Sequence, residues 1–234
     1  MKPTLPLLLS LNGGYVDTAG FLALQGLFTA HVTGNLVTAG AAVVFGTSGV
    51  VSKLLAIPVF CLVVMAVRGL GATIGHSTSS TVRILLGIKL TLLIVAAILA
   101  LELGPFPDGD ALPALVTGLT LVAAMAVQNA VQRIHMPTAP TTTIMTGNTT
   151  QLMIDLADVL RGAPEAVPGQ SRARLKRTAG NMLTFVFGCA AAAAMFFYTQ
   201  MWCFVVPPVL ALIAVLVRAE FPPPAPAPAP AKAA

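Results

Sequence analysis

The stretch Thr33-Gly34-Asn35 occurs a second time as Thr146-Gly147-Asn148, 113 residues further along the chain. The residues before it recur as well, because Val16-Asp17-Thr18-Ala19 corresponds to Val127-Gln128-Asn129-Ala130 at an offset of 111. Each tripeptide is followed by a short run that is compatible with a helix, and then by a long apolar segment. A repeated unit determines how the rest of a sequence is divided. We therefore divide this chain into two related halves.

The composition is typical of a membrane protein. Of the 234 residues, 56% are hydrophobic and 9% are charged, whereas a soluble domain has about 25% charged residues. Because so few charged groups cannot cover a water-exposed surface, we predict that the lipid bilayer covers much of it. The net charge of +5 does not indicate nucleic-acid binding, since the basic residues are spread over several loops. The three cysteines lie in apolar runs without metal-type spacing, so we expect no metal site. The sequence contains no paired carboxylates, His/Cys cluster, phosphate loop or dinucleotide fingerprint, so we expect no cofactor.

Six segments approach the roughly 20 apolar residues that a transmembrane helix needs. We predict spans at residues 5–28, 54–72, 84–103, 111–131, 182–198 and 202–217. The runs that begin at the repeated tripeptides, residues 33–45 and 146–161, are shorter than a span. The second of these runs is amphipathic because it carries Asp155 and Asp158.

The connections between these segments have characteristic compositions. The halves, residues 1–104 and 105–220, meet at a stretch rich in Pro, Gly and Asp, which we expect to form a loop. We predict a basic linker before the fifth span (Arg172, Arg174, Lys176 and Arg177). Pro207-Pro208 should kink the sixth span, and the Pro-Ala tail at residues 221–234 should be disordered and extended.

The distribution of Lys and Arg predicts the orientation in the membrane. With six spans and a cytoplasmic N-terminus, twelve of the thirteen Lys and Arg residues fall on or near the cytoplasmic side, and Lys53 lies outside. Arg68, Lys89 and Arg133 are counted among the twelve because they lie near predicted span ends, from which long side chains can reach the interface. Cytoplasmic loops carry an excess of Lys and Arg. Both termini are therefore predicted to be cytoplasmic.

An odd number of spans in each half requires the halves to cross the membrane in opposite directions. The predicted fold is an all-α membrane protein of six transmembrane helices, arranged as two inverted three-span repeats that each contain a short Thr-Gly-Asn helix. The first tripeptide then lies toward the outer side and the second toward the cytoplasm. Many secondary transporters have inverted repeats with short or broken helices, and they bind their solute where the repeats meet.

The paired motifs resemble those of a known family. Gly14-Tyr15-Val16-Asp17 with Thr33-Gly34-Asn35, and Ala126-Val127-Gln128-Asn129-Ala130 with Thr146-Gly147-Asn148, are similar to motifs of the YoaK family. The resemblance covers about residues 7–217. It implies a six-span protein of the bacterial inner membrane. The function of that family is unknown, so the resemblance implies no substrate, cofactor or catalytic residue.

Asp17 is the acidic residue that lies farthest from any predicted span end. A charge at such a depth costs several kcal/mol, and intramembrane acids usually mark a solute pathway or a proton relay. Alternatively, Asp17 is hydrogen-bonded and joins the first span to the backbone of a neighbour. Gln128 occupies the equivalent place in the fourth span. His31, two residues before the first tripeptide, is either a pH-sensitive gate or an ordinary interfacial histidine.

The two tripeptides are typical of helix starts. Thr or Asn can cap the free N–H groups of the following helix, and Gly permits a bend. If both short helices dip into the membrane, their N-termini would meet near Asp17 and Gln128 and suit a polar or anionic solute. Alternatively, the two helices lie flat at the interface and bind nothing. The candidate solute-binding residues are Asp17, Thr33, Asn35, Gln128, Asn129, Thr146 and Asn148.

The function favoured by these patterns is a permease for a small polar or anionic solute. A non-transporting membrane scaffold or sensor is the alternative, and an intramembrane enzyme comes third. A serine protease built on Ser48 is disfavoured because the predicted spans of the second half contain no histidine to act as a base. Gly188 and the run Ala190–Ala194 indicate close helix packing. A homo-oligomer is compatible with the sequence.

Overall fold

The computed structural model describes residues 4–74, 78–162 and 169–217 of the chain, and the predicted tail at residues 221–234 lies outside these ranges. Within them the chain is helical apart from its connecting loops. The helices are α1 (Leu5–Ala23), α2 (Gly34–Phe45), α3 (Val50–Ile74), α4 (Thr78–Leu103), α5 (Leu112–His135), α6 (Met145–Arg161), α7 (Gln170–Thr199), the 3-10 helix η1 (Gln200–Val205) and α8 (Val206–Leu216).

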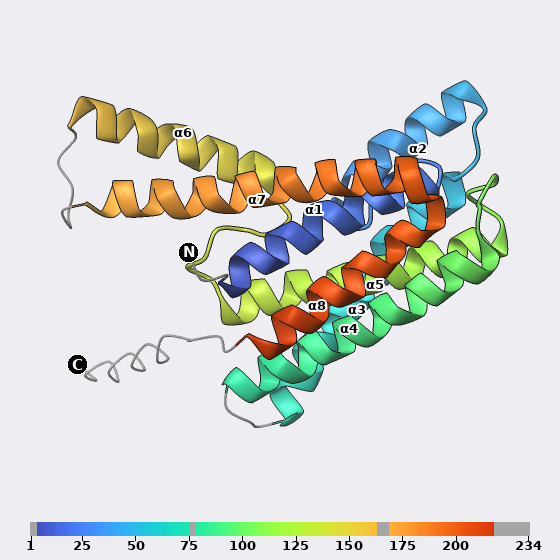
Figure 1. The fold of residues 1–234 in the computed structure, drawn as a ribbon, viewed down its shortest axis with the longest axis horizontal. Helices are drawn as coiled ribbons and strands as arrows, with labels where there is room; N and C mark the ends of the chain where they lie inside the picture. Colours follow the sequence, from blue (N-terminus) through green and yellow to red (C-terminus); the bar gives the residue numbers. More distant parts are fainter. Residues whose placement is uncertain (1–3, 75–77, 163–168, 218–234) are drawn as a thin grey trace, which may run out of the picture.

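The long helices form a bundle in which neighbours along the chain run in opposite directions. In Figure 1, α1, α4 and α7 run from left to right, and α3, α5 and α8 run from right to left. Helix α1 packs against α7 and α8, and helix α5 packs against α3 and α4. The short helix α2 packs on α3, and α6 packs on α7. Helices α2 and α6 point toward opposite ends of the molecule (Figure 1).

Four helical segments of the described ranges are long and apolar enough to cross a membrane. They are Val50–Gly71, Ser79–Leu103, Leu112–His135 and Gln170–Leu216. The last segment has 47 residues and comprises α7, η1 and α8, and the chain turns back on itself at η1 (Figure 1). These segments make the chain a multi-pass membrane protein.

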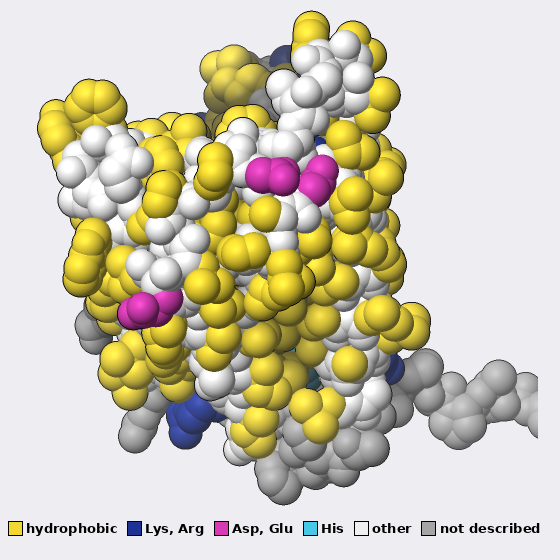
Figure 2. Space-filling view, turned by 90° about the vertical axis from the view of Figure 1, so that its right-hand side faces the viewer, with side chains coloured by type: hydrophobic (Ala, Val, Ile, Leu, Met, Phe, Trp, Pro, Cys, Tyr) yellow, Lys and Arg dark blue, Asp and Glu magenta, His cyan; other side chains and the backbone are white. Residues whose placement is uncertain are grey.

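The surface agrees with this assignment. Figure 2 shows the end of the molecule that lies at the right of Figure 1, and hydrophobic side chains cover most of this face. Exposed large apolar residues occur on helices from both halves, among them Val44, Phe45, Leu183, Phe197 and Trp202. Acidic side chains appear at a few places on this face (Figure 2). The exposed apolar side chains of these helices are suited to lipid rather than to water.

Helix α1 ends earlier than the sequence predicts. The first span was expected to continue to Phe28, but α1 stops at Ala23. Gln25 and Gly26 have positive φ angles of 52° and 80°, which a right-handed helix cannot accommodate. The Gln25 side chain is held in this turn because its Nε2 donates a hydrogen bond to the Phe106 carbonyl at 3.0 Å.

Two predictions for the second half are also wrong. The basic residues from Arg172 to Arg177 do not form a linker but lie inside α7, since the Arg- and Lys-rich run favours a helix. Pro207 and Pro208 do not kink a helix. They lie in the first turn of α8, where the N–H that proline lacks has no intrahelical partner. The change of direction occurs upstream in η1, which begins at Gln200 with a φ of 50°.

Glycines allow α1 and α7 to approach each other closely. A Cβ atom added to Gly188 would lie 2.3 Å from the Leu11 carbonyl oxygen, and one added to Gly14 would lie 2.2 Å from the Phe185 carbonyl oxygen. Both distances are far below van der Waals contact, so the helices could not pack in this way with any larger residue. The prediction of close helix packing at Gly188 is confirmed.

Candidate functional site

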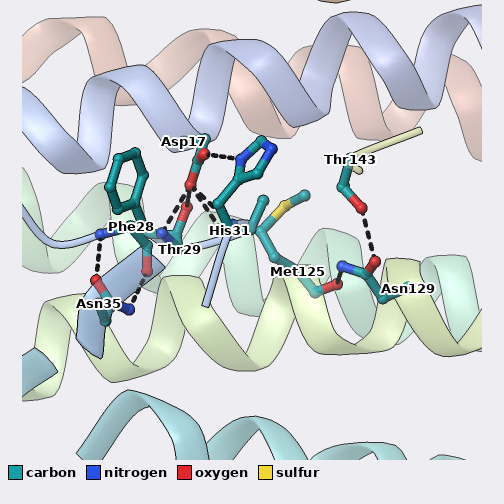
Figure 3. Close-up of polar contacts among 9 residues, drawn as sticks. Asp17, Phe28, Thr29, His31, Asn35, Met125, Asn129 and Thr143 are labelled. Carbon is teal, nitrogen blue, oxygen red and sulfur yellow. Dashed lines mark hydrogen bonds and ion pairs between the residues drawn. The ribbon is translucent and has the colours of Figure 1, made fainter. Parts of the chain in front are cut away.

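The loop between α1 and α2, residues 24–33, is held by Asp17. The Asp17 Oδ1 atom accepts hydrogen bonds from the backbone N–H groups of Thr29 at 2.8 Å and Ala30 at 2.7 Å. Its Oδ2 atom lies 2.6 Å from His31 Nδ1. Asp17 is buried, whereas the His31 side chain is 34% exposed. Charge-assisted hydrogen bonds of this kind are strong in a low-dielectric interior, so Asp17 attaches this first loop to α1 (Figure 3).

Asn35 closes the same loop from its other end. Its Oδ1 accepts a hydrogen bond from the Phe28 N–H at 2.8 Å, and its Nδ2 donates one to the Phe28 carbonyl at 2.8 Å (Figure 3). Thr33 directly precedes α2, but its side chain forms no capping hydrogen bond. The sequence predicted that Thr or Asn of the tripeptide could cap the helix, but Thr33 does not cap it, and Asn35 binds the loop before the helix.

Asn148 repeats this arrangement in the second loop, residues 136–144, which connects α5 to α6. Its Oδ1 accepts a hydrogen bond from the Thr141 N–H at 3.3 Å, and its Nδ2 donates one to the Thr141 carbonyl at 2.7 Å. Helix α6 begins at Met145, so Thr146 lies within its first turn and does not occupy the cap position. In both halves the asparagine of the repeated tripeptide binds the backbone of the residue seven positions earlier.

Gln132 binds the backbone of the second loop as Asp17 binds the backbone of the first loop. Its Oε1 accepts hydrogen bonds from the Thr142 N–H at 3.0 Å and from Thr142 Oγ1 at 3.1 Å. Gln128, one turn earlier on the same face of α5, donates from Nε2 to the Leu9 carbonyl at 2.9 Å and to Thr142 Oγ1 at 3.0 Å. The sequence comparison selected Gln128 and missed Gln132. The i, i+4 spacing of the two glutamines was the available signal.

Asn129 binds the second loop at the adjacent residue. Its Oδ1 accepts a hydrogen bond from Thr143 Oγ1 at 2.7 Å, and its Nδ2 donates to the Met125 carbonyl at 2.9 Å. Figure 3 shows the Asn129–Thr143 pair and the Asp17–His31 pair between α1 and α5.

The two polar clusters lie near each other along α1. A Cβ atom added to Gly13 would be 2.9 Å from the Thr142 carbonyl oxygen and 3.4 Å from Gln128 Nε2. Gly13 is four residues before Asp17, which corresponds to about 6 Å along a helix axis. The structure therefore brings Asp17, Gln128 and their loops to neighbouring levels of α1. The predicted residues Thr33 and Thr146 are exposed.

Lys89 is a further residue of this region that the sequence interpretation misplaced. Its side chain is 0% exposed, and its Nζ donates a hydrogen bond to Gln128 Oε1 at 2.5 Å. The predicted span began at Ile84 and placed Lys89 near an end. Helix α4 begins at Thr78, so Lys89 lies about 16 Å from its start and does not extend to the membrane interface. The signal was its isolation, because no other charged residue occurs between Arg83 and Glu102.

The chain matches the model of the family described as "Protein of unknown function (DUF1275)" over residues 5–217. It belongs to this family. No curated protein and no solved structure matches the chain. Membership of the DUF1275 family assigns no substrate, and the resemblance to the YoaK family stays a prediction. The function of this DUF1275 protein has to be argued from the geometry of its helices and loops.

Helix α6 of the DUF1275 protein is attached to α7 by an ion pair between the buried Asp155 carboxylate and the partly exposed Arg174 side chain. Arg174 Nε lies 2.9 Å from Asp155 Oδ1 and 2.7 Å from Oδ2, its Nη2 also contacts Oδ1, and Gln151 Nε2 donates to Oδ1 at 2.8 Å. Hydrogen bonding by Arg174 lowers the pKa of Asp155, although burial opposes this shift. In Figure 1, α6 and the first part of α7 form a hairpin that projects beyond the bundle at the left.

Metal binding has no evident ligand set in this protein. Over residues 4–74, 78–162 and 169–217, no three His, Cys, Asp or Glu side chains come together as metal ligands do. The polar groups of the candidate site are the carboxylate and imidazole of the Asp17–His31 contact, the amine and amide of the Lys89–Gln128 contact, and the amides that bind the two loops. This set is suited to holding a charged or polar solute by hydrogen bonds and charge.

Proposed function

We propose that this DUF1275 protein is a permease for a small polar or anionic solute in the bacterial inner membrane. In this proposal α1, α3, α4, α5, α7 and α8 each cross the bilayer, and both termini are cytoplasmic. The two halves form inverted repeats, and the solute binds where the repeats meet, near Asp17 and Gln128.

The packing of the helices supports the inverted repeat. Exchanging the halves pairs α1 with α5, α2 with α6, α3 with α7 and α4 with α8. Under this exchange, the packing of α1 on α7 corresponds to the packing of α5 on α3. The packing of α4 on α5 corresponds to the packing of α8 on α1. Both members of each pair of contacts occur. The antiparallel directions of α1 and α5 in Figure 1 are those that an inverted repeat requires.

The observation that carries the proposal is the burial of ionisable groups at the junction of the two halves. Asp17 and Lys89 are 4% and 0% exposed. Asp17 binds the loop of the first half, and Lys89 of the first half binds Gln128 of the second half. Burying such groups in a membrane protein is costly, and they usually face a solute pathway or take part in proton transfer. A protein that merely spans the bilayer has no need of them.

The two loops provide a mechanism for alternating access. Each loop precedes a short helix, and these helices point toward opposite ends of the molecule (Figure 1). In the proposed cycle, release of the first loop from Asp17 opens the junction toward the end where α2 lies. Release of the second loop from Gln128 and Gln132 opens it toward the end where α6 lies. Movement of one repeat against the other would open the two sides in turn.

Cysteine labelling tests this proposal. Thr33→Cys and Thr146→Cys, in a protein whose three native cysteines are replaced, would be exposed to a membrane-impermeant maleimide in right-side-out and inside-out vesicles. A permease predicts that each position reacts from both faces. Reaction of each position from one face only would contradict alternating access. Glu102→Cys and Arg172→Cys serve as controls, because they should react from the outer and the cytoplasmic face respectively.

The charge of Asp17 is tested with Asp17→Asn in the same assay. Asparagine retains the oxygen that accepts the Thr29 and Ala30 N–H groups but removes the carboxylate next to His31. We expect this variant to fold and insert but to react from a single face. Glu102→Gln, at an exposed position, is the matched control. Reaction from both faces in Asp17→Asn would show that alternating access does not require this charge.

A membrane scaffold or sensor is the second candidate. It is favoured by the fact that the side chains of Asp17, Asn35 and Asn148 bind the loops of the protein itself. The labelling experiment separates the two functions, because a scaffold predicts that Thr33 reacts from the outer face and Thr146 from the cytoplasmic face under all conditions.

A further inference from the structure

We infer that Lys89 is the solute-binding group of this membrane protein, and that the solute is a small monovalent anion that binds together with one proton. This inference rests on the proposed permease function and specifies its substrate class. It is tested by equilibrium binding, which does not require that transport be observed.

Lys89 occupies a polar layer between two apolar clusters. On α4, Leu85 and Leu86 belong to one cluster and Leu93 belongs to the other. These residues lie three or four positions from Lys89 and therefore share its face of the helix. The amine is thus enclosed near the middle of a 26-residue helix, at a depth where neither water nor lipid headgroups can solvate it.

The hydrogen bonding of Gln128 directs its oxygen toward Lys89. The Gln128 Nε2 group donates to the Leu9 carbonyl and to Thr142 Oγ1. Both of these partners can accept a hydrogen bond, so the amide nitrogen faces them and Oε1 remains for Lys89 Nζ. The orientation of the amide is therefore determined by three contacts from three different elements.

The amine has no anionic partner in the part of the chain that the structure describes. The ion pairs found there are Asp17–His31 and Asp155–Arg174, and Lys89 belongs to neither. A buried ammonium with one neutral acceptor is strongly disfavoured, because its desolvation is not compensated. Lys89 must therefore either be a neutral amine or have an anion next to it. A binding site that holds a neutral amine when it is empty, and an ammonium paired with an anion when it is occupied, never contains an uncompensated charge.

The binding step is balanced in charge and atoms. In the empty site Nζ is an amine with a lone pair. The lone pair takes up one proton from solution, and the ammonium that forms pairs with the incoming anion. One positive and one negative charge enter together, so the interior gains no net charge. A single cationic group neutralises a single negative charge, which is why the inferred solute is monovalent.

Other titratable groups in the region of Lys89 lie on α4 itself and on the elements that pack against α4. Helix α8 carries none. The remaining groups on α4 and on the packed elements are Arg83 and Glu102 of α4 itself, Lys53, Cys61 and Arg68 of α3, Arg133 and His135 of α5, and Cys203 of η1. Within the described ranges none of these residues forms an ion pair with Lys89.

Two orphan polar atoms on α1 support a ligand at this level. Ser10 Oγ and Asn12 Oδ1 are buried without a hydrogen-bond partner. Ser10 and Asn12 follow Leu9, whose carbonyl is bound by Gln128, by one and three residues. The Asn12 amide donates from Nδ2 to the Pro207 carbonyl at 3.2 Å, so Ser10 is the residue with a free hydroxyl. Buried polar atoms without partners are rare in native proteins and often indicate an unseen ligand or water. A hydroxyl such as that of Ser10 can donate to an anion.

Thermal unfolding of the purified full-length protein in detergent tests the inference. The sodium salts of chloride, nitrate, formate and acetate would be titrated against sodium gluconate at constant ionic strength, with sulfate as the divalent comparison. We expect at least one of the four monovalent anions to raise the melting temperature in a saturable manner. Sulfate should have no such effect. If none of the four raises the melting temperature, the inference is wrong.

The pH dependence distinguishes coupled protonation from simple charge attraction. If one proton binds with each anion, the apparent Kd should rise about tenfold for each pH unit in the range where the empty amine is neutral. Lys89→Arg provides the comparison, because a guanidinium remains protonated at all relevant pH values. This variant should bind the anion with an affinity that does not change with pH. An anion affinity of the unmodified protein that is constant between pH 6 and pH 8 would overturn the proton coupling.

Two further variants locate the binding site. Lys89→Met should lose the rise in melting temperature. Lys53→Met is the matched control, because Lys53 is also buried but donates to the Gln25 carbonyl at 2.7 Å. Lys53→Met should show the full rise in melting temperature on addition of the anion. If Lys89→Met does not fold, the loss of pH dependence in Lys89→Arg decides the question. A rise that persists in Lys89→Met would overturn the assignment.

The inference and the proposed function can fail separately. Anion binding that depends on Lys89, in a protein whose Thr33 and Thr146 positions each react from one face, would retain the site and refute the permease. Labelling from both faces without binding that depends on Lys89 would retain the permease and refute the site.

Discussion

Asn35 and Asn148 bind the backbone in the same way. Each side-chain amide accepts a hydrogen bond from the N–H group, and donates one to the carbonyl, of the residue seven positions earlier. These earlier residues are Phe28 and Thr141. The two bonds close the loop before each short helix and determine where that helix begins. The asparagine is therefore the member of the repeated tripeptide with a defined structural role, and the threonine is exposed in both copies.

Replacing either asparagine should destabilise the protein by a similar amount. Asn35→Ala and Asn148→Ala each remove two hydrogen bonds and leave a backbone N–H and carbonyl without their partners. We expect each change to lower the free energy of unfolding by about 1–3 kcal/mol, measured by thermal or denaturant unfolding in detergent. Thr33→Ala and Thr146→Ala are the matched controls, with effects of about 0.5 kcal/mol or less. Equal effects for Asn and Thr variants would contradict the role of the amides.

The two substitutions of Asp17 should differ strongly. Asp17→Ala removes the acceptor of the Thr29 and Ala30 N–H groups, which are buried, and we expect a loss of about 3 kcal/mol in the free energy of unfolding. Asp17→Asn retains one side-chain oxygen as acceptor, so its free energy of unfolding should fall by much less. Unfolding measured on the two variants side by side checks this order. If both variants are equally unstable, the contact of the carboxylate with His31 rather than the backbone hydrogen bonds stabilises the loop.

The glycines between α1 and α7 should not tolerate a side chain. Because the added Cβ would meet a carbonyl oxygen at 2.2 Å or 2.3 Å, Gly14→Ala and Gly188→Ala must push the helices apart. We expect each to cost about 3 kcal/mol or more, with reduced yield of folded protein in detergent. Gly180→Ala on α7 is the control, because its Cβ would lie 3.7 Å from the Leu7 side chain. The control should be neutral or stabilising by up to about 1 kcal/mol.

The α6–α7 hairpin should loosen in acid. Arg174 lowers the pKa of Asp155 in the folded protein, so the unfolded state binds a proton more readily than the folded state does. The stabilisation is present above the unfolded pKa of about 3.9 and is lost as the pH falls through the folded pKa. Hydrogen exchange of the α6 amides, corrected for intrinsic rates, should be constant between pH 7 and pH 5 and rise below about pH 4.

Two variants control this experiment. Asp155→Asn should remove the acid dependence and give faster exchange already at pH 7, because its neutral amide cannot form the ion pair. Asp158→Asn on the same helix should retain the acid dependence of the unmodified protein. Acid-induced exchange that is unchanged in Asp155→Asn would assign the effect to another group.

The membrane character could be predicted from composition, and membership of a family of unknown function could be predicted from the repeated motifs. The low charge content predicted lipid-covered helices, and four long apolar helices are present in the described ranges. The limits of α1 and α7 could not be predicted. The first helix stops in a turn that is held by Phe106, a residue 81 positions away from Gln25. The basic part of α7 was assigned to a linker because a charged run before an apolar segment does not reveal whether the helix continues through it.

The candidate site was predicted in part. Asp17, Asn35, Gln128, Asn129 and Asn148 all contact the two loops, but their partners were not foreseen. Gln132 was missed because the comparison of the two halves relied on sequence offset rather than on hydrogen-bond geometry. The burial of Lys89 was missed because the predicted start of its span was six residues late, which moved the amine toward an interface that it does not reach.

By itself the sequence determined that this chain lies in a membrane and that each copy of the repeated tripeptide lies at the start of a short helix. These properties depend on composition and on motifs within short stretches, because transfer into lipid depends on the apolar character of each segment separately. Only the tertiary structure decided which polar groups meet: Asp17 with the first loop, Lys89 with Gln128, and Asp155 with Arg174. Those pairs depend on distances between helices that are remote in the chain, and glycine contacts such as that of Gly188 with α1 determine those distances.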